Sequence, residues 1–164
     1  MVKQHSYLVL LLTVVTLCGL AMAACSMRTT PLTTFHQKCG WKAEDLFQDA
    51  ATVALCKALE VNDLQELDRL VTAGANVNKK GKGNITPLVW AFPDNALPRF
   101  TRMLEHGADP NVVFQEDFNT RGLMAPGSSV THLACATKFP GYFEAVFANG
   151  GDPNLVNVKH TREG

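Results

Sequence analysis

The chain has 164 residues, a formal net charge of zero and a hydrophobic fraction of 46%. This length is enough for one modest domain. The zero net charge argues against nucleic-acid binding, because such binding needs an excess of basic residues to neutralise phosphates.

Residues 1–24 are expected to form a secretory signal peptide. Lys3 places a positive charge near the N-terminus, and an uncharged stretch rich in Leu and Val follows over 7–20. Small residues dominate positions 21–24, which completes the usual order of such a signal. A membrane-spanning helix needs about 20 apolar residues, and Arg28 limits the length of this stretch. Cleavage is therefore favoured, with an uncleaved membrane anchor as the alternative.

Two ways of processing this signal stay open. Ordinary signal peptidase would cut after Ala23 and leave Ala24 at the N-terminus. Alternatively, Met22-Ala23-Ala24-Cys25 resembles a bacterial lipobox, although Leu is the usual residue at the position of Met22. The resemblance implies acylation of Cys25, which would anchor the chain firmly. We favour this lipoprotein interpretation, with residues 25–40 as a tether. It places the protein in the bacterial cell envelope, at the outer membrane or in the periplasm.

A five-residue motif occurs three times in the rest of the chain. Each copy lies 21 residues after the start of an apolar segment, at 53–58, 86–91 and 129–134. This constant spacing indicates a repeated structural unit. The copies are Gly74-Ala75-Asn76-Val77-Asn78, Gly107-Ala108-Asp109-Pro110-Asn111 and Gly150-Gly151-Asp152-Pro153-Asn154.

The unit resembles the ankyrin repeat, which has 33 residues, a Thr-Pro-Leu-His-x-Ala start and a Gly-Ala-Asp-x-Asn finish. Thr86-Pro87-Leu88 and His132 match the start, whereas the first copy has lost both Thr and Pro. The resemblance implies an all-α solenoid of about three helix-turn-helix repeats over residues 41–164. Its parts are expected to be an N-terminal cap at 41–52 and repeats at about 53–85, 86–128 (with an insertion) and 129–161.

Capping residues predict where the helices begin and end. In the second repeat, Thr86 is expected to cap a first helix that Pro93 ends. Pro98 then opens the second helix, and Gly107 ends it because a left-handed cap favours a residue without a side chain. The other repeats are expected to use Asp63 with Glu66 as a capping box, and Pro140 and Gly150 as the opening and closing residues of the last helix.

Apolar residues at helical spacing predict the core. Three equivalent sets are expected on the second helices. Small alanines on the first helices should permit close packing, and a helix over 41–51 should cover the open end of the stack through Leu46, Phe47 and Ala50. The sets are Leu67, Phe100 and Phe143; Leu70, Met103 and Val146; and Val71, Leu104 and Phe147; the alanines are Ala58, Ala91 and Ala134.

The three cysteines that follow Cys25 allow two redox states. Export permits a disulfide, and Cys39 and Cys56 are close enough in sequence to form one. The alternative is that all remain reduced. Cys135 falls at a small position of its repeat that is expected to be buried.

Two connections between repeats are candidates for binding a partner. The first is a basic tip with Lys79, Lys80 and Lys82, for which a simple solvated turn is the alternative. The second is a long segment over 112–128, which either binds a partner or packs back on the repeats. Its candidate residues are Phe114, Glu116, Asp117 and Phe118, and Trp90 on a first helix is either a binding residue or a core residue.

The sequence shows no catalytic motif, and no histidine has the spacing of a metal site. His132 is expected to link loop and helix by hydrogen bonds. We therefore expect a protein-binding module without catalytic residues, cofactor or metal. Two rivals stay open: an immunity or inhibitor protein acting in the envelope, and a fragment of an enzyme whose catalytic domain lies beyond Gly164.

Overall fold

The computed structural model describes residues 34–118, 120 and 124–156. This part of the chain is helical and contains no strand, so the expectation of an all-α fold is confirmed for it. None of its helices is long and apolar enough to cross a membrane. The predicted signal peptide, the lipidation of Cys25 and the end of the third repeat lie outside the described residues.

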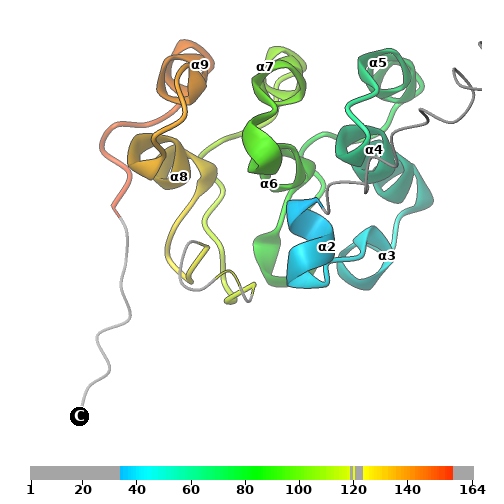
Figure 1. The fold of residues 1–164 in the computed structure, drawn as a ribbon, viewed down its shortest axis with the longest axis horizontal. Helices are drawn as coiled ribbons and strands as arrows, with labels where there is room; N and C mark the ends of the chain where they lie inside the picture. The colour runs from blue at the N-terminus through cyan, green and yellow to red at the C-terminus, as the bar shows by residue number, and fades with distance from the viewer. Residues whose placement is uncertain (1–33, 119, 121–123, 157–164) are drawn as a thin grey trace, which may run out of the picture. The chain divides into compact units, whose positions relative to one another are not determined.

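Six of the described helices form three consecutive pairs that stack side by side. In Figure 1 the first helices of the pairs lie in one row and the second helices in another. Contacts run within each pair and between neighbouring pairs. The pairs are α4 (Ala50–Glu60) with α5 (Leu64–Thr72), α6 (Pro87–Ala91) with α7 (Leu97–Glu105), and α8 (Val130–Ala136) with α9 (Tyr142–Ala148).

A glycine in the left-handed conformation follows the second helix of each pair. Gly74, Gly107 and Gly150 have φ angles of 97°, 83° and 90°. A side chain is unfavourable in this conformation, which is why glycine stands where the chain must leave the helix. The repeated motif in the sequence therefore marks the ends of α5, α7 and α9, as predicted.

The last asparagine of each motif ties its turn to the next one. The side chain of Asn78 donates to the carbonyl of Gly107 at 2.9 Å and accepts from the backbone N–H of Asp109 at 2.7 Å. Asn111 makes the same two bonds to Gly150 and Asp152, at 2.8 and 2.9 Å. A side-chain amide suits this position because it offers a donor and an acceptor together.

Among the described residues, two short helices precede the pairs. Helix α2 (Phe35–Cys39) begins with a capping box between Thr34 and Gln37, and α3 (Ala43–Leu46) follows after Gly40. Figure 1 shows both beside the row that contains α4 and α6.

The predicted N-terminal cap is wrong as a single helix over 41–51. The chain becomes extended at Phe47, and a new helix, α4, begins at Ala50. Asp49 causes this second start because its carboxylate accepts the backbone N–H of Thr52 at 2.9 Å. Phe47 is buried as expected, whereas Ala50 is exposed.

The third pair departs from the expected core. Phe143 is 52% exposed, so its predicted equivalence with buried Phe100 is wrong. Tyr142 takes the inner position instead, with its ring centroid 4.8 Å from that of Phe100. The cause is a late helix start: Gly141 caps α9, rather than Pro140 opening it. Cys135 is exposed and not buried as predicted. The other alanine and core positions agree with the expectation, apart from the half-buried Val71 and Phe147.

Two capping predictions are correct in position and wrong in chemistry. Thr86 precedes α6, but its buried hydroxyl makes no hydrogen bond among the described residues. Asp63 accepts the backbone N–H of Glu66 at 3.0 Å. Glu66 does not complete a capping box, because both of its oxygens bind Arg69 at 2.6 Å.

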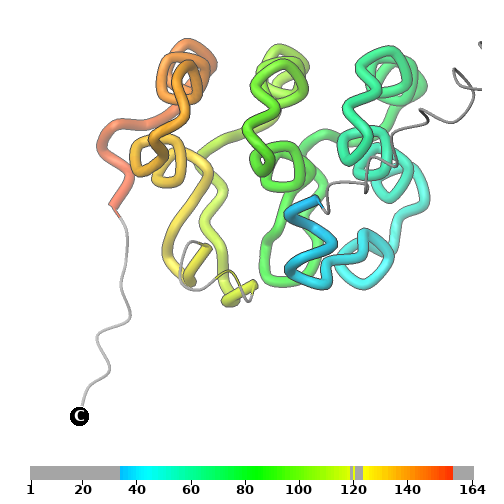
Figure 2. The backbone as a smooth tube through the Cα atoms, in the orientation of Figure 1, coloured from blue at the N-terminus to red at the C-terminus, as the bar shows by residue number. Residues whose placement is uncertain are grey.

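The described part of the segment over 112–128, which excludes residues 119 and 121–123, packs back on the repeats. Phe114 donates its backbone N–H to Ser128, and Gly127 returns a bond to the carbonyl of Phe114. Gln115 donates to the carbonyl of Gly83 at 2.9 Å, which joins the segment to the lysine-rich connection. Figure 2 shows the segment extending to the same side of the stack as α2 and α3.

Candidate functional site

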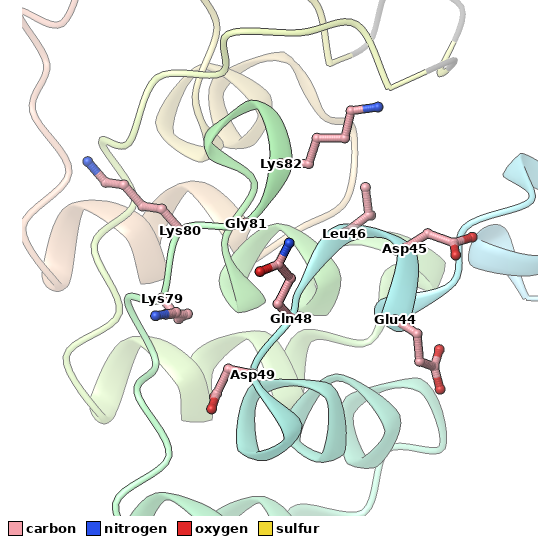
Figure 3. Close-up of a pocket in the computed structure, with 9 residues that line it drawn as sticks. All are labelled: Glu44, Asp45, Leu46, Gln48, Asp49, Lys79, Lys80, Gly81 and Lys82. Carbon is pink, nitrogen blue, oxygen red and sulfur yellow. The ribbon is translucent and has the colours of Figure 1, made fainter.

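The lysine-rich connection faces the α3 region across an open cleft of about 690 Å³. One wall carries ammonium groups, and the other carries carboxylates and an amide. Figure 3 shows the Gln48 side chain between the two walls, with Lys79 and Lys80 on one side of the connection and Lys82 on the other. The lining residues are Glu44, Asp45, Leu46, Gln48, Asp49, Lys79, Lys80, Gly81 and Lys82.

Local contacts hold the acidic wall in place. Asp49 accepts from both the backbone N–H and the hydroxyl of Thr52, and the side-chain bond lowers the pKa of this carboxyl group. Glu44 forms an ion pair with Lys57 of α4 at 2.5 Å, and this hydrogen bond lowers the pKa of Glu44. Two of the three carboxylates in the wall are therefore already engaged within the protein.

The basic wall is held by a close approach of backbone to backbone. Gly81 lies so near α3 that a Cβ atom there would overlap the carbonyl oxygen of Leu46 and lie 2.8 Å from ring atoms of Phe47. The N–H of Gly81 donates to the carbonyl of Ile85 at 2.8 Å, which closes a short turn that includes η1 (Lys82–Asn84). The side chain of Asn84 donates to the carbonyl of Val113 at 3.3 Å.

The lysines of this wall differ in their partners. Lys82 lies 3.7 Å from Glu116 of the 112–128 segment, and both side chains are largely exposed. In the part of the chain that the structure describes, Lys79 and Lys80 form no ion pair within 4.0 Å. The charge of Lys79 helps to lower the pKa of Asp49 without forming an ion pair with it. The cleft therefore presents two ammonium groups that lie beyond ion-pair distance of the described carboxylates.

The aromatic candidates are buried. Trp90 is 0% exposed, stacks on His36 at 4.6 Å and donates its indole N–H to Glu60 at 3.0 Å. Phe114 and Phe118 are 1% and 7% exposed. These three rings pack in the core, which was the alternative interpretation for each. Glu116 and Asp117 are exposed beside them.

His132 has the structural role expected for it. Its Nδ1 accepts from the backbone N–H of Ser129 at 3.2 Å, so Nε2 carries the proton and donates to the carbonyl of Leu155 at 3.1 Å. Within the described ranges, no group of three or more His, Cys, Asp or Glu side chains could hold a metal ion. Cys56 is buried in α4, and burial raises the pKa of its thiol. The Cys39–Cys56 disulfide stays a prediction.

The sequence analysis missed the acidic wall. Glu44, Asp45 and Asp49 fall within the single capping helix that was expected over 41–51, and no role was predicted for them. The available signal was Asp49 itself, because an Asp before an apolar helical segment is a typical N-cap. Recognising that cap would have ended the preceding helix and indicated an exposed corner opposite the lysines.

A second hollow of about 480 Å³ lies on another part of the stack. Apolar side chains from α2, η2 (Pro93–Asn95), α8 and the residues after α8 form most of its walls. The residues that contribute include Phe35, Phe92, Met124, Leu133 and Phe139.

No protein-family model matches the chain. A stretch of 74 residues, 44% of the chain, is 34% identical to palmitoyltransferase ZDHHC13 of Mus musculus. The proteins of the same description from Homo sapiens and Pongo abelii match with the same identity over the same length. The match spans only 12% of the length of these relatives.

Proposed function

We propose that this chain is a non-catalytic protein-binding module, built as an ankyrin-repeat solenoid, and that it binds an acidic segment of another protein through the cleft between α3 and the lysine-rich connection. The observation that carries the proposal is the pair Lys79 and Lys80, which lie on a fixed wall and have no ion partner among the described residues. We further propose that the module is exported and held in the bacterial envelope by a lipid on Cys25.

The repeated architecture supports the scaffold part of this proposal. The spacing of the three motifs, the glycine after each second helix and the bonds of Asn78 and Asn111 all recur at matching positions. Stacked repeats of this kind contact mainly their neighbours and offer an extended surface along one side. Such scaffolds serve binding, and the identity of the partner depends on the residues presented at the connections.

The chemistry of the cleft supports the partner class. A lysine ammonium without a protein partner attracts carboxylates, and the acidic wall opposite would repel an anion that entered too deeply. Lys57 compensates the charge of Glu44, whereas Asp49 stays negatively charged and its hydrogen bonds with Thr52 hold it in place. The favoured ligand is therefore an extended acidic segment that follows the lysine wall, with Gln48 available for a hydrogen bond to its backbone.

A site-specific crosslinking experiment tests the binding site. A photoreactive amino acid replaces Lys80 in one variant and Lys138, another exposed lysine that follows α8, in a control variant. We expect a discrete protein adduct from position 80 in cells and none from position 138. We also expect Lys79→Glu to reduce the yield at position 80. Equal labelling from both positions, or no discrete adduct from position 80, would contradict the proposal.

The anchor is tested separately. Cys25→Ala should move the protein from the membrane fraction to the soluble fraction of the envelope, and mass analysis of the mature wild-type N-terminus should show acyl chains. Unchanged membrane attachment in the variant would refute the lipid anchor, while leaving the cleft proposal intact.

A further inference from the structure

The contact between α2 and α6 depends on a buried histidine. His36 is 1% exposed, and its ring stacks on Trp90 with centroids 4.6 Å apart and an interplanar angle of 26°. Trp41, just after α2, lies against both rings, at 6.0 Å from His36 and 5.5 Å from Trp90. The imidazole ring of His36 and its aromatic neighbours therefore lie at the contact between the segment over 34–41 and the stack. Two hydrogen bonds add to this contact, from the backbone N–H of Phe35 to Asp94 and from the indole N–H of Trp41 to Phe118.

The two nitrogens of this ring are unequal. Nε2 lies 2.9 Å from the carbonyl oxygen of Trp90, so it carries a proton and donates. Nδ1 is buried and has no hydrogen-bond partner among the described residues. Its nearest acidic group is Asp94, whose Oδ2 is 3.9 Å away. A buried nitrogen without a partner is costly, and it is also the atom that would accept a second proton.

The charges around the ring oppose that second proton on balance. Asp94 of η2 favours an imidazolium, but it already accepts the backbone N–H of Phe35 at 2.8 Å and contacts Arg99 at 3.4 Å. Arg99 of α7 is itself a buried cation. Glu60 of α4 accepts from the indole of Trp90 at 3.0 Å, and its charge also acts on Arg99. Burial is the main cause that lowers the pKa of His36, and Arg99 adds to it.

Arg99 has little freedom to move away. Its guanidinium donates to three backbone carbonyls, those of Leu59, Ala91 and Pro93, at 2.8, 3.0 and 2.6 Å. A protonated His36 would therefore face a fixed cation in a site that excludes water. The ring can escape only by leaving the stack, and it takes α2 with it.

We propose that α2 is an acid-sensitive clasp: protonation of His36 releases the segment over 34–41 from α6 and uncovers the Trp90 face of the stack. This inference does not depend on the proposed function of the cleft. The clasp stays closed at neutral pH, where the imidazole is uncharged.

The direction of the pH dependence follows from proton binding. The free segment takes up a proton near the ordinary histidine pKa of about 6.5, and the docked segment does so only at lower pH. Between these two values the released state binds more protons than the docked state, so docking weakens as pH falls. The equilibrium between docked and released forms shifts by up to about tenfold for each pH unit in that range.

Release changes the surface of the protein in a defined place. The buried face of Trp90 becomes accessible, and the bond from the indole N–H of Trp41 to the carbonyl of Phe118, 2.9 Å long, is lost. Both tryptophans of the chain lie at this contact. Their fluorescence therefore reports on the clasp directly.

The test uses the full chain in a mild detergent, titrated from pH 8 to pH 5. We expect a red shift of tryptophan emission below about pH 6.5, while the far-ultraviolet circular dichroism signal stays nearly constant. Hydrogen exchange, corrected for intrinsic pH effects, should show lost protection of the Phe35 amide, which donates to the carboxylate of Asp94 in η2 at 2.8 Å. Amides of α5 should keep their protection.

Two histidine variants complete the test. His36→Gln keeps a donor for the Trp90 carbonyl but cannot gain a proton, so its emission should not change over this range. His106→Gln removes the histidine that pairs with Asp68 at 2.7 Å, and it should behave like the wild type. A wild-type emission and exchange pattern that is unchanged to pH 5 would overturn the proposal. A transition that persists in His36→Gln, or one that coincides with loss of helical signal, would overturn it as well.

Discussion

Replacing Gly81 by alanine should disturb the cleft through a steric overlap and leave the local backbone geometry unstrained. The φ angle of Gly81 is −95°, a value that any residue adopts. The added Cβ would lie 2.8 Å from two ring atoms of Phe47, about 0.6 Å inside ordinary contact distance. It would also overlap the carbonyl oxygen of Leu46, which belongs to backbone and cannot rotate away.

The expected cost follows from the type of overlap. Forcing an extra methyl group into a packed contact costs about 1–3 kcal/mol. We expect Gly81→Ala to lower the free energy of unfolding by about 2 kcal/mol, or to move α3 away from the connection. Urea denaturation measures the first outcome. Loss of amide protection at Phe47, which bonds to Ala43 in the wild type, measures the second.

Gly107 provides a control, because a side chain there would strain the backbone without any steric overlap. Its φ angle is 83°, and nothing lies within 4 Å of a Cβ placed there. Alanine should cost about 1–2 kcal/mol through backbone strain alone. Asparagine tolerates this conformation better, so Gly107→Asn should be milder than Gly107→Ala. At Gly81 the order should be opposite, because asparagine is larger. The same order at both sites would refute the steric explanation for Gly81.

Three further predictions concern the packing of the stack. Asn111→Ala should lower the free energy of unfolding by about 1–3 kcal/mol, because it leaves backbone groups of the next turn without their partner. Asn154→Ala should lower it little, since Asn154 binds no later turn among the described residues. Urea denaturation compares the two variants, and equal costs would contradict a stabilising role for the bonds between turns. Arg99→Met should lower the free energy of unfolding by about 3 kcal/mol or more, because three carbonyls lose their donor. Replacing the half-exposed Arg102 by Met should lower it by less than about 1 kcal/mol. Similar thermal midpoints for the two variants would contradict this difference. Burial raises the pKa of Tyr142 to about 12, and its hydroxyl has no partner among the described residues. Tyr142→Phe should therefore leave stability at pH 7 unchanged or raise it, and it should remove the loss of stability that the wild type shows as pH rises above about 10. A clear loss of stability in the variant at pH 7 would contradict this expectation.

The sequence was sufficient to predict the helix pairs because their limits depend on local chemistry. Gly74, Gly107 and Gly150 end helices by adopting the left-handed conformation, which glycine favours whatever its surroundings. Pro93 and Pro98 restrict the helices of the second pair in the same way. The inter-turn bonds of Asn78 and Asn111 were not predicted, because the motif shows that the asparagines recur and does not show what they bind.

The remaining features depend on contacts between distant residues. Helical spacing assigned Phe143 to the core, and a shift in the start of α9 gave that place to Tyr142. The burial of Trp90 requires α2 to lie against it, and the sequence around Trp90 contains no sign of that contact. Only the basic half of the cleft was predicted, since Lys79 and Lys80 are adjacent while their acidic counterparts come from a segment 30 or more residues earlier.

The central claim is that the lysine wall binds an acidic segment of a partner protein. The most direct measurement is the affinity of the partner captured at position 80 for the wild type and for the double variant Lys79→Glu, Lys80→Glu, with Lys138→Glu as control. We predict at least a tenfold weaker binding for the double variant, about 1.4 kcal/mol, and a smaller dependence of affinity on salt. Unchanged affinity in the double variant, or an equal loss in Lys138→Glu, would contradict the claim.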